Sequence, residues 1–258
     1  MELIDTHCHI DVGAFDADRE EVLEAARAVG VAEMVVPAIH RQGWEGLLEC
    51  CGAHQGLHPA LGLHPVYLGM HEPDDLVALD HRLALEEGLV AVGEIGLDFF
   101  LRDLDRQRQM ELCEAQLALA RDHGLPVLLH VRKGHEEMLG LLKRTGVGGG
   151  IVHAFNGSLQ QAGRYLDLGF RLGFGGMLTW PRSTRLRRLA AELPLEAIVL
   201  ETDAPDLTVV QHRGERNSPA FLPFCLAALA EVRRMEMEEV AEATTRSARQ
   251  VLRLGDSP

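Results

Sequence analysis

The stretch Leu3-Ile4-Asp5-Thr6-His7-Cys8-His9 indicates the fold most directly, because a short apolar run ends there in an Asp-x-His-x-His motif. Alternate side chains of a strand share one face, so Asp5, His7 and His9 would point the same way. Neutral imidazoles are ligands for zinc, manganese, iron, nickel or copper. We therefore predict a strand over residues 3–8 that ends in two converging imidazoles. By itself, this motif is equally compatible with packed or solvated histidines.

Further short apolar runs follow, separated by segments with apolar residues at helical spacing. The expected strands cover residues 3–8, 33–38, 58–62, 89–94, 126–130, 150–153, 170–175 and 197–203. Expected helices include residues 16–30, 107–124, 135–145 and 158–169, several of which start at Asp or Ser and end at Gly, and two more at 221–234 and 236–252. Eight alternating units predict an α/β fold, a closed (β/α)8 TIM barrel forming one domain over residues 1–258. A doubly wound sheet is the alternative, but no Gly-x-Gly-x-x-Gly follows the first strand.

The composition is typical of a globular protein and limits its partners. The chain has 25 basic and 39 acidic residues, a net charge of -14, and 47% apolar residues. This charge argues against a broad basic face that coats nucleic acid, but not against metal ions that hold one phosphate. Five cysteines are too few for a disulfide framework in a chain of this size. We see no basic leader and no long apolar run, so we expect a cytoplasmic protein without a membrane partner.

Imidazoles and carboxylates recur where the expected strands end, which is where barrel enzymes collect catalytic groups. Taken singly, each histidine is more simply explained by a hydrogen bond to the backbone. Together, several imidazoles and carboxylates around one barrel mouth would be costly to bury without a cation. The residues at these ends are His7, His9, His64, Glu94, His130, His153, Glu201 and Asp203.

Two divalent ions fit the number of ligands. His7, His9 and Asp203 are predicted to hold one ion and His130 and His153 the other, and Glu94 would bridge both through its two oxygens. A bridging carboxylate suits ions about 3.5–4 Å apart. Mixed imidazole and carboxylate ligands favour zinc, manganese, iron, cobalt or nickel over calcium, and magnesium fits where phosphate and water complete the shell. Magnesium, manganese and zinc all stay open as the cofactor.

Roles follow from this ligand set. A water activated by the two ions would be the nucleophile, with Glu94 bridging them and Asp203 orienting the water and accepting its proton. His64 is not needed as a ligand, and we assign it to phosphate contact or leaving-group protonation. Glu201 would bind an additional metal or fix a ligand imidazole, and it is also among the candidate substrate-binding residues. Asp98, expected on the loop after the fourth strand, would cap the next element or assist the site, and Asp5 is expected to be a buried partner of neighbouring groups.

The chain resembles the TatD family of metal-dependent deoxyribonucleases, over nearly its whole length. The resemblance implies a TIM barrel, the two-metal ligand division given above, and hydrolysis of DNA phosphodiester bonds, often from a 3′ end. The matching segments are Asp5-Thr6-His7-Cys8-His9, Gly62-Leu63-His64-Pro65, Gly93-Glu94-Ile95-Gly96-Leu97-Asp98, Pro126-Val127-Leu128-Leu129-His130-Val131-Arg132, His153-Ala154-Phe155-Asn156-Gly157-Ser158 and Glu201-Thr202-Asp203-Ala204-Pro205.

Some segments depart from the usual sequence motifs of the family. Asp206 stands where many members carry an aromatic residue, and Lys133-Gly134-His135 replaces the usual acidic residue after the fifth strand. Together with Thr179-Trp180-Pro181-Arg182, these departures indicate a separate branch of the family. They leave the metal ligands untouched and bear on substrate preference.

Arginines near the expected barrel mouth are candidates for substrate contact. Arg132 follows the fifth strand, and the resemblance favours Arg213 and Arg216 after the eighth. The expected partner is DNA, as single strands or ends, because a duplex would not fit a metal-lined pit without fraying. No protein partner is indicated. The alternative function is hydrolysis of an amide or ester in a small metabolite or an aminoacyl ester, and a third hypothesis is a metal-stabilised scaffold.

Overall fold

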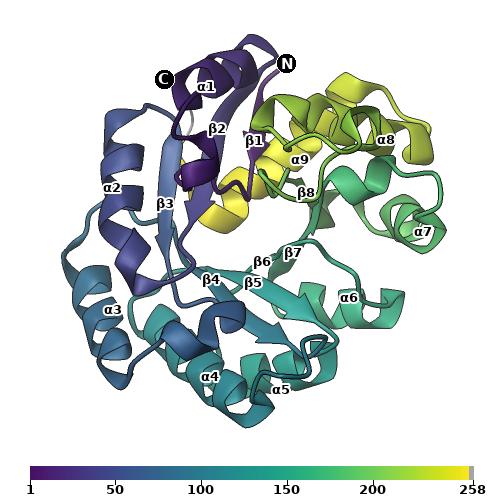
Figure 1. Cartoon of the computed structure of the whole chain (residues 1–258). Helices are drawn as coiled ribbons and strands as arrows, with labels where there is room; N and C mark the ends of the chain where they lie inside the picture. The colour runs from purple at the N-terminus through teal and green to yellow at the C-terminus, as the bar shows by residue number, and fades with distance from the viewer. Residues whose placement is uncertain (256–258) are drawn as a thin grey trace.

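Eight parallel strands form one sheet in the order β1 to β8, and the helices surround it as an outer ring (Figure 1). The computed structural model describes residues 1–255, so the last three residues of the predicted domain lie outside the described residues. The strands are β1 (Leu3–Asp5), β2 (Val31–Pro37), β3 (Leu57–Leu61), β4 (Ala91–Asp98), β5 (Val127–Arg132), β6 (Gly150–Val152), β7 (Phe170–Phe174) and β8 (Ile198–Leu200). The predicted single-domain (β/α)8 barrel is confirmed.

The helices follow the strands in the expected alternation. They are α1 (Arg19–Ala28), α2 (Trp44–Ala53), α3 (Pro73–Leu85), α4 (Arg106–Asp122), α5 (His135–Thr145), α6 (Leu159–Asp167), α7 (Thr184–Glu192), α8 (Leu222–Arg233) and α9 (Met237–Leu252). Within residues 1–255, none is both long and apolar enough to span a membrane.

The seam between β8 and β1 is joined just beyond the ends of the two strands. The backbone N–H of Thr6 donates to the carbonyl of Leu200 at 3.0 Å, and that of Asp203 donates to the carbonyl of His7 at 2.8 Å. These bonds bring the segment that carries His7 beside the segment that carries Asp203. Closing the sheet therefore also assembles part of the candidate site.

The barrel interior and the helix layer form two apolar clusters. The inner cluster takes residues from seven strands and closes against Ala248 and Leu252 of α9, so α9 covers the end of the barrel where the strands begin. The strand residues of this inner cluster are Ile4, Val35, Ala60, Ala91, Leu128, Ile151 and Val199. The opposite end, where the strands finish, is left for polar groups, as in other barrels of this class.

Strand ends differ from the predicted ones in a way that matters for the site. β1 ends at Asp5 and β8 at Leu200, so His7 and Asp203 lie on loops beyond the strands. β4 instead continues to Asp98, which pairs with Arg132 of β5. The prediction that Asp98 lies on a loop is therefore wrong, because the ladder between β4 and β5 extends that far.

Candidate metal centre

His7 and His9 converge just after β1. Their Nε2 atoms are 3.3 Å apart, and His9 Nδ1 lies 3.1 Å from the carbonyl oxygen of Pro37. When its Nδ1 donates to this carbonyl, His9 is able to present a lone pair on Nε2 to the cluster. Burial and the neighbouring His153 lower the pKa of His7 well below its usual range, so the His7 imidazole is neutral.

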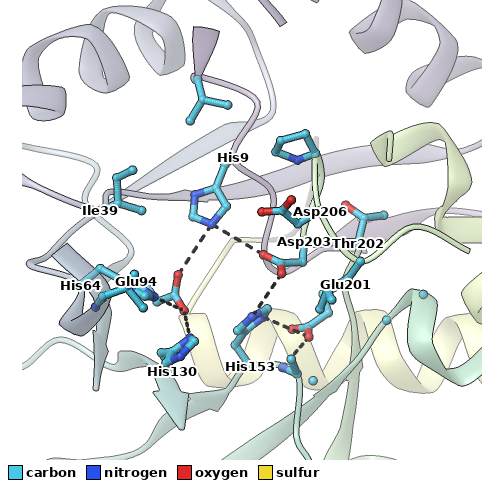
Figure 2. Close-up of a pocket in the computed structure, with 18 of the residues that line it drawn as sticks. His9, Ile39, His64, Glu94, His130, His153, Glu201, Thr202, Asp203 and Asp206 are labelled. Atoms are coloured by element: carbon cyan, nitrogen blue, oxygen red, sulfur yellow. Dashed lines mark hydrogen bonds and ion pairs between the residues drawn. The ribbon is translucent and has the colours of Figure 1, made fainter. Parts of the chain in front are cut away.

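Glu94 of β4 lies between two sets of imidazoles, and each of its oxygens faces a different set (Figure 2). Oε2 is 3.1 Å from His7 Nε2 and 3.6 Å from His9 Nε2, whereas Oε1 is 3.0 Å from His130 Nδ1 and 3.2 Å from His64 Nε2. Burial raises the pKa of Glu94, but the imidazoles of His64 and His7 outweigh it and hold this pKa well below its usual range. The side chain is therefore a carboxylate that is able to bridge.

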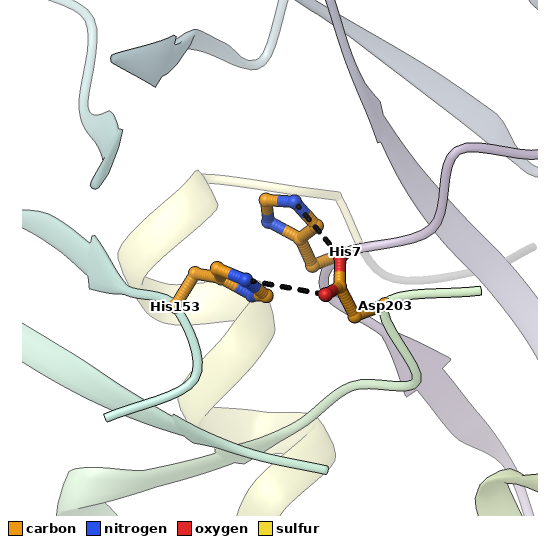
Figure 3. A group of neighbouring side chains, drawn as sticks. All are labelled: His7, His153 and Asp203. Carbon is orange, nitrogen blue, oxygen red and sulfur yellow. Dashed lines mark ion pairs between the residues drawn. The ribbon is translucent and has the colours of Figure 1, made fainter. Parts of the chain in front are cut away.

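Asp203 lies across the cluster, close to His7 and His153 (Figure 3). Its Oδ1 is 3.7 Å from His7 Nε2 and 3.6 Å from His9 Nε2, and its Oδ2 is 3.6 Å from His153 Nε2. Burial raises the pKa of Asp203 to about 6. Its backbone φ of 59° is in the left-handed region, which non-glycine residues seldom adopt and which recurs at functional sites.

The described residues form three groups of possible ligand atoms that lie within 4.8 Å of one another. All six predicted metal ligands belong to at least one group, and His64, predicted to act on the substrate, also belongs to one. His153 groups with His7 and Asp203 rather than with its predicted partner His130, whose ring centroid is 6.5 Å away. The groups are His7, His153 and Asp203; His7, His9 and Glu94; and His64, Glu94 and His130.

The donor set fits divalent transition metals. Two nitrogen ligands of one tetrahedral zinc ion, each bonded at about 2.0–2.1 Å, lie about 3.3–3.4 Å apart. The Nε2 atoms of His7 and His9 show this separation, and the carboxylate of Glu94 is within 3.6 Å of both. A cation among these atoms would offset the cost of burying a carboxylate in this site.

Asp5 fixes the loops that carry His7 and Asp203. Its Oδ1 accepts from the backbone N–H of Thr202 at 2.9 Å and from that of His7 at 3.2 Å, while the Thr202 hydroxyl donates to Oδ2. Burial raises the pKa of Asp5 to about 7. The side chain is fully buried and lies outside the three ligand groups, in line with the predicted supporting role.

Asn217 is a supporting residue that sequence reasoning missed. Its buried amide donates to the carbonyl of Thr202 at 2.8 Å and to that of Asp206 at 2.6 Å, so it braces the loop that carries Asp203 on both sides. In the sequence, Asn217 stands before Ser218-Pro219, a pattern that indicates only a turn.

Asp98 connects a candidate metal ligand with a candidate substrate residue. Its Oδ2 is 3.1 Å from His130 Nε2 and 3.1 Å from the Nη1 of Arg132. Burial raises the pKa of Asp98, but the hydrogen bond from His130 outweighs it and lowers this pKa. Asp98 is therefore an anion that orients the His130 ring, as carboxylate partners of metal-binding histidines commonly do.

Glu201, which follows β8 directly, supports His153. Its Oε1 accepts from the backbone N–H of Ala154 at 2.6 Å and lies 3.1 Å from His153 Nδ1. Gly173 makes room for this carboxylate, because a Cβ there would lie 2.1 Å from Glu201 Oε2. Burial lowers the pKa of His153, but the charges of Glu201 and Asp203 outweigh it and raise this pKa to about 10.

The cluster opens into a cleft of about 1440 Å³ that contains some of the predicted substrate residues and not others. Arg132 and Glu201 line it, whereas Arg213 and Arg216 do not. Arg216 instead binds both carboxylate oxygens of Asp18, at 2.9 and 2.6 Å. The structure thus directs Arg216 away from the cluster.

A parallel barrel with imidazoles and carboxylates gathered at its mouth is the arrangement of a metal-dependent hydrolase, and comparison with known proteins agrees. The family model described as TatD related DNase matches residues 4–253, and the chain belongs to this family. It is a metal-dependent hydrolase with the TIM-barrel fold.

Relatives and solved structures support this assignment. The chain is 42% identical to YjjV of Escherichia coli (strain K12), described as an uncharacterised metal-dependent hydrolase, over 93% of each protein. It is 33% identical to a Klebsiella pneumoniae (strain 342) protein named 3'-5' ssDNA/RNA exonuclease TatD, over 96% of each. The crystal structure of E. coli YjjV superposes with a TM-score of 0.94 at 39% identity, covering 98% of both chains.

Proposed function

We propose that this protein is a two-metal phosphodiesterase that hydrolyses DNA, acting on single strands or ends from the 3′ side. The observation that carries the proposal is the placement of Glu94. One of its oxygens faces His7 and His9, and the other faces His64 and His130. A carboxylate shared in this way between two ligand groups is able to bridge ions about 3.5–4 Å apart, the spacing of binuclear hydrolytic sites.

Bound divalent ions would supply a water with a lowered pKa and would stabilise charge on the phosphoryl oxygens. We assign the first ion to His7, His9, Asp203 and Glu94, and the second to Glu94, His130 and His153. His64 lies in the same group as His130 and is a further candidate ligand. Magnesium, manganese and zinc are all compatible with these ligands.

Asp203 is our candidate for orienting the attacking water and accepting its proton. It lines the cleft, and 15% of its side chain is exposed, so it is within reach of a substrate group. Its two oxygens face different imidazoles, which fixes the carboxylate plane. A positioned carboxylate of this kind is a suitable general base.

Arg132 is our candidate for contact with a substrate phosphate. It lines the cleft beside His130, and Asp98 holds one of its guanidinium nitrogens at 3.1 Å. Its remaining N–H groups are able to donate to phosphate oxygens, which the planar guanidinium matches well. His64 also lines the cleft, and we keep it as a candidate for phosphate contact or leaving-group protonation.

A nucleic-acid substrate is favoured over a small amide or ester by the relatives. The Klebsiella protein is named an exonuclease of single-stranded DNA and RNA, and the matching family model is described as a DNase. The net charge of -14 favours weak, distributive binding to a strand end rather than tracking along a duplex.

One substrate panel tests the proposal. Purified protein loaded with magnesium, manganese or zinc is offered single-stranded and duplex DNA labelled at either end, RNA, amides and carboxylic esters. Asp203→Asn serves as the blank, and Asp167→Asn, on the exposed end of α6, is the matched control. We expect 3′-end shortening of DNA by wild type and the control only. Intact DNA together with amide or ester turnover contradicts the proposal.

A further inference from the structure

Trp180 lies close to two arginines that are far apart in the sequence. It follows the short helix η4 (Gly176–Thr179), and its indole N–H donates to the carbonyl of Thr208 at 3.1 Å. The guanidinium carbon of Arg182 is 4.9 Å from the centre of the indole ring, and that of Arg213 is 5.8 Å from it. One anchored aromatic ring therefore holds two cations near each other.

These two arginines differ from the others that lie over aromatic rings in the described chain. Arg106 also donates to a backbone carbonyl, Arg132 pairs with Asp98, and Arg216 pairs with Asp18. Arg182 and Arg213 make no hydrogen bond or ion pair with any described residue. In a protein with a net charge of -14, two adjacent cations without a carboxylate partner are unusual.

Arg182 connects the pair with the catalytic cleft, which Arg213 itself does not line. Arg182 lines this cleft together with His153 and Asp203, and the lining continues onto Ser183 and Thr184 at the start of α7. A helix N-terminus attracts anions, so the start of α7 favours a phosphate beside Arg182. Asp206 lines the same side, and neither arginine is paired with it.

We propose that Arg182, Trp180 and Arg213 form a clamp that binds two backbone phosphates of a single-stranded nucleic acid whose end occupies the metal centre. This inference rests on the proposed function and extends it, because it requires a polynucleotide rather than a mononucleotide ester. Guanidinium groups bind phosphate through paired N–H donors, and the aromatic ring keeps both planes oriented. Arginine planes and aromatic rings also stack on unpaired bases without sequence preference.

Salt dependence of binding provides the test. A fluorescent phosphorothioate oligothymidylate of about 20 nucleotides is titrated with metal-loaded protein by anisotropy, because each phosphate contact to a single strand contributes about 0.7 to the slope of log K against log salt. The variant is R182A/R213A. The control is K143A/R246A, which removes the same charge from exposed positions on α5 and α9. Turnover of the p-nitrophenyl ester of thymidine monophosphate and of end-labelled DNA is measured in parallel.

We expect the slope to fall by about 1.4 in R182A/R213A, corresponding to roughly sixtyfold weaker binding at about 50 mM salt when both contacts are lost. Turnover of the small ester stays within about twofold of wild type, and K143A/R246A changes neither quantity. An unchanged slope in a protein that still degrades DNA overturns the clamp. If R182A/R213A lowers the slope while wild-type protein binds DNA but never cleaves it, the clamp stands and the proposed function is overturned instead.

Discussion

Asp5 offers the sharpest test of how the barrel seam organises the site. Its carboxylate accepts three hydrogen bonds, two from Thr202 and one from the backbone of His7. Replacement of Asp5 by Ala would leave these buried donors without a partner. Replacement by Asn would keep the oxygen that accepts from both backbone N–H groups and would place an amide beside the Thr202 hydroxyl, which is able to accept from it.

The expected loss of stability follows from these bonds. A buried donor left unsatisfied costs about 1–3 kcal/mol, so the two bonds from Thr202 alone predict that Asp5→Ala lowers the free energy of unfolding by about 2–6 kcal/mol. That is a large part of the roughly 5–15 kcal/mol typical of a folded domain. Asp5→Asn is expected to lower the free energy of unfolding by less than about 1.5 kcal/mol.

Urea denaturation of the metal-free proteins measures this difference without a contribution from bound ions. We expect the midpoint to fall markedly for Asp5→Ala and little for Asp5→Asn, with the denaturant slope unchanged in both. Metal affinity should follow the same order, since Asp5 holds the segments of His7 and Asp203 together. A midpoint for Asp5→Ala within the error of wild type would refute the role assigned to this carboxylate.

Other predictions concern the ions, Glu94, Gly173 and Arg216. Chelation should abolish DNA cleavage and lower the melting temperature by roughly 5–10 °C for each ion removed, because one ligand at about 100 times its dissociation constant stabilises a fold by about 2.7 kcal/mol. Calorimetry with and without chelator measures this, and identical curves contradict it. Glu94→Gln should bind fewer ions by elemental analysis and should lose at least about 100-fold in turnover. Retention of two ions and full activity would exclude Glu94 as the bridging carboxylate. Gly173→Ala should displace the Glu201 side chain, because the new Cβ would lie 2.1 Å from Glu201 Oε2. We expect the free energy of unfolding in urea to fall by about 1–3 kcal/mol. An unchanged urea midpoint would show that the carboxylate has room to move. Arg216→Ala should leave DNA turnover unchanged, since Asp18 occupies its guanidinium, and a fall in turnover would restore it as a substrate residue.

The fold could be predicted from the sequence because each strand is a short apolar run between helical segments. Strand ends were harder to predict, since they depend on pairing with a neighbour. Asp98 shows the reason, because no residue near it indicates where the strand ends. Only the pairing of Asp98 with Arg132 of β5 extends β4 to that position.

The candidate ligands could also be listed from the sequence, because each lies at or just beyond the end of a predicted strand. Their grouping could not, since it depends on side-chain direction across the barrel. His64 lies against Glu94 and His130, and His153 stacks on His7 at 3.7 Å between ring centroids. The supporting role of Asn217 could not be predicted either, because its two acceptors are backbone carbonyls that only the folded loop brings together.

Cleavage of single-stranded DNA as a function of added manganese per chain tests the central claim most directly. The account predicts that metal-free protein is inactive and that activity rises until about two ions are bound per chain, with Asp203→Asn inactive throughout. Saturation at about one ion per chain, or DNA left intact at every metal concentration, would contradict it.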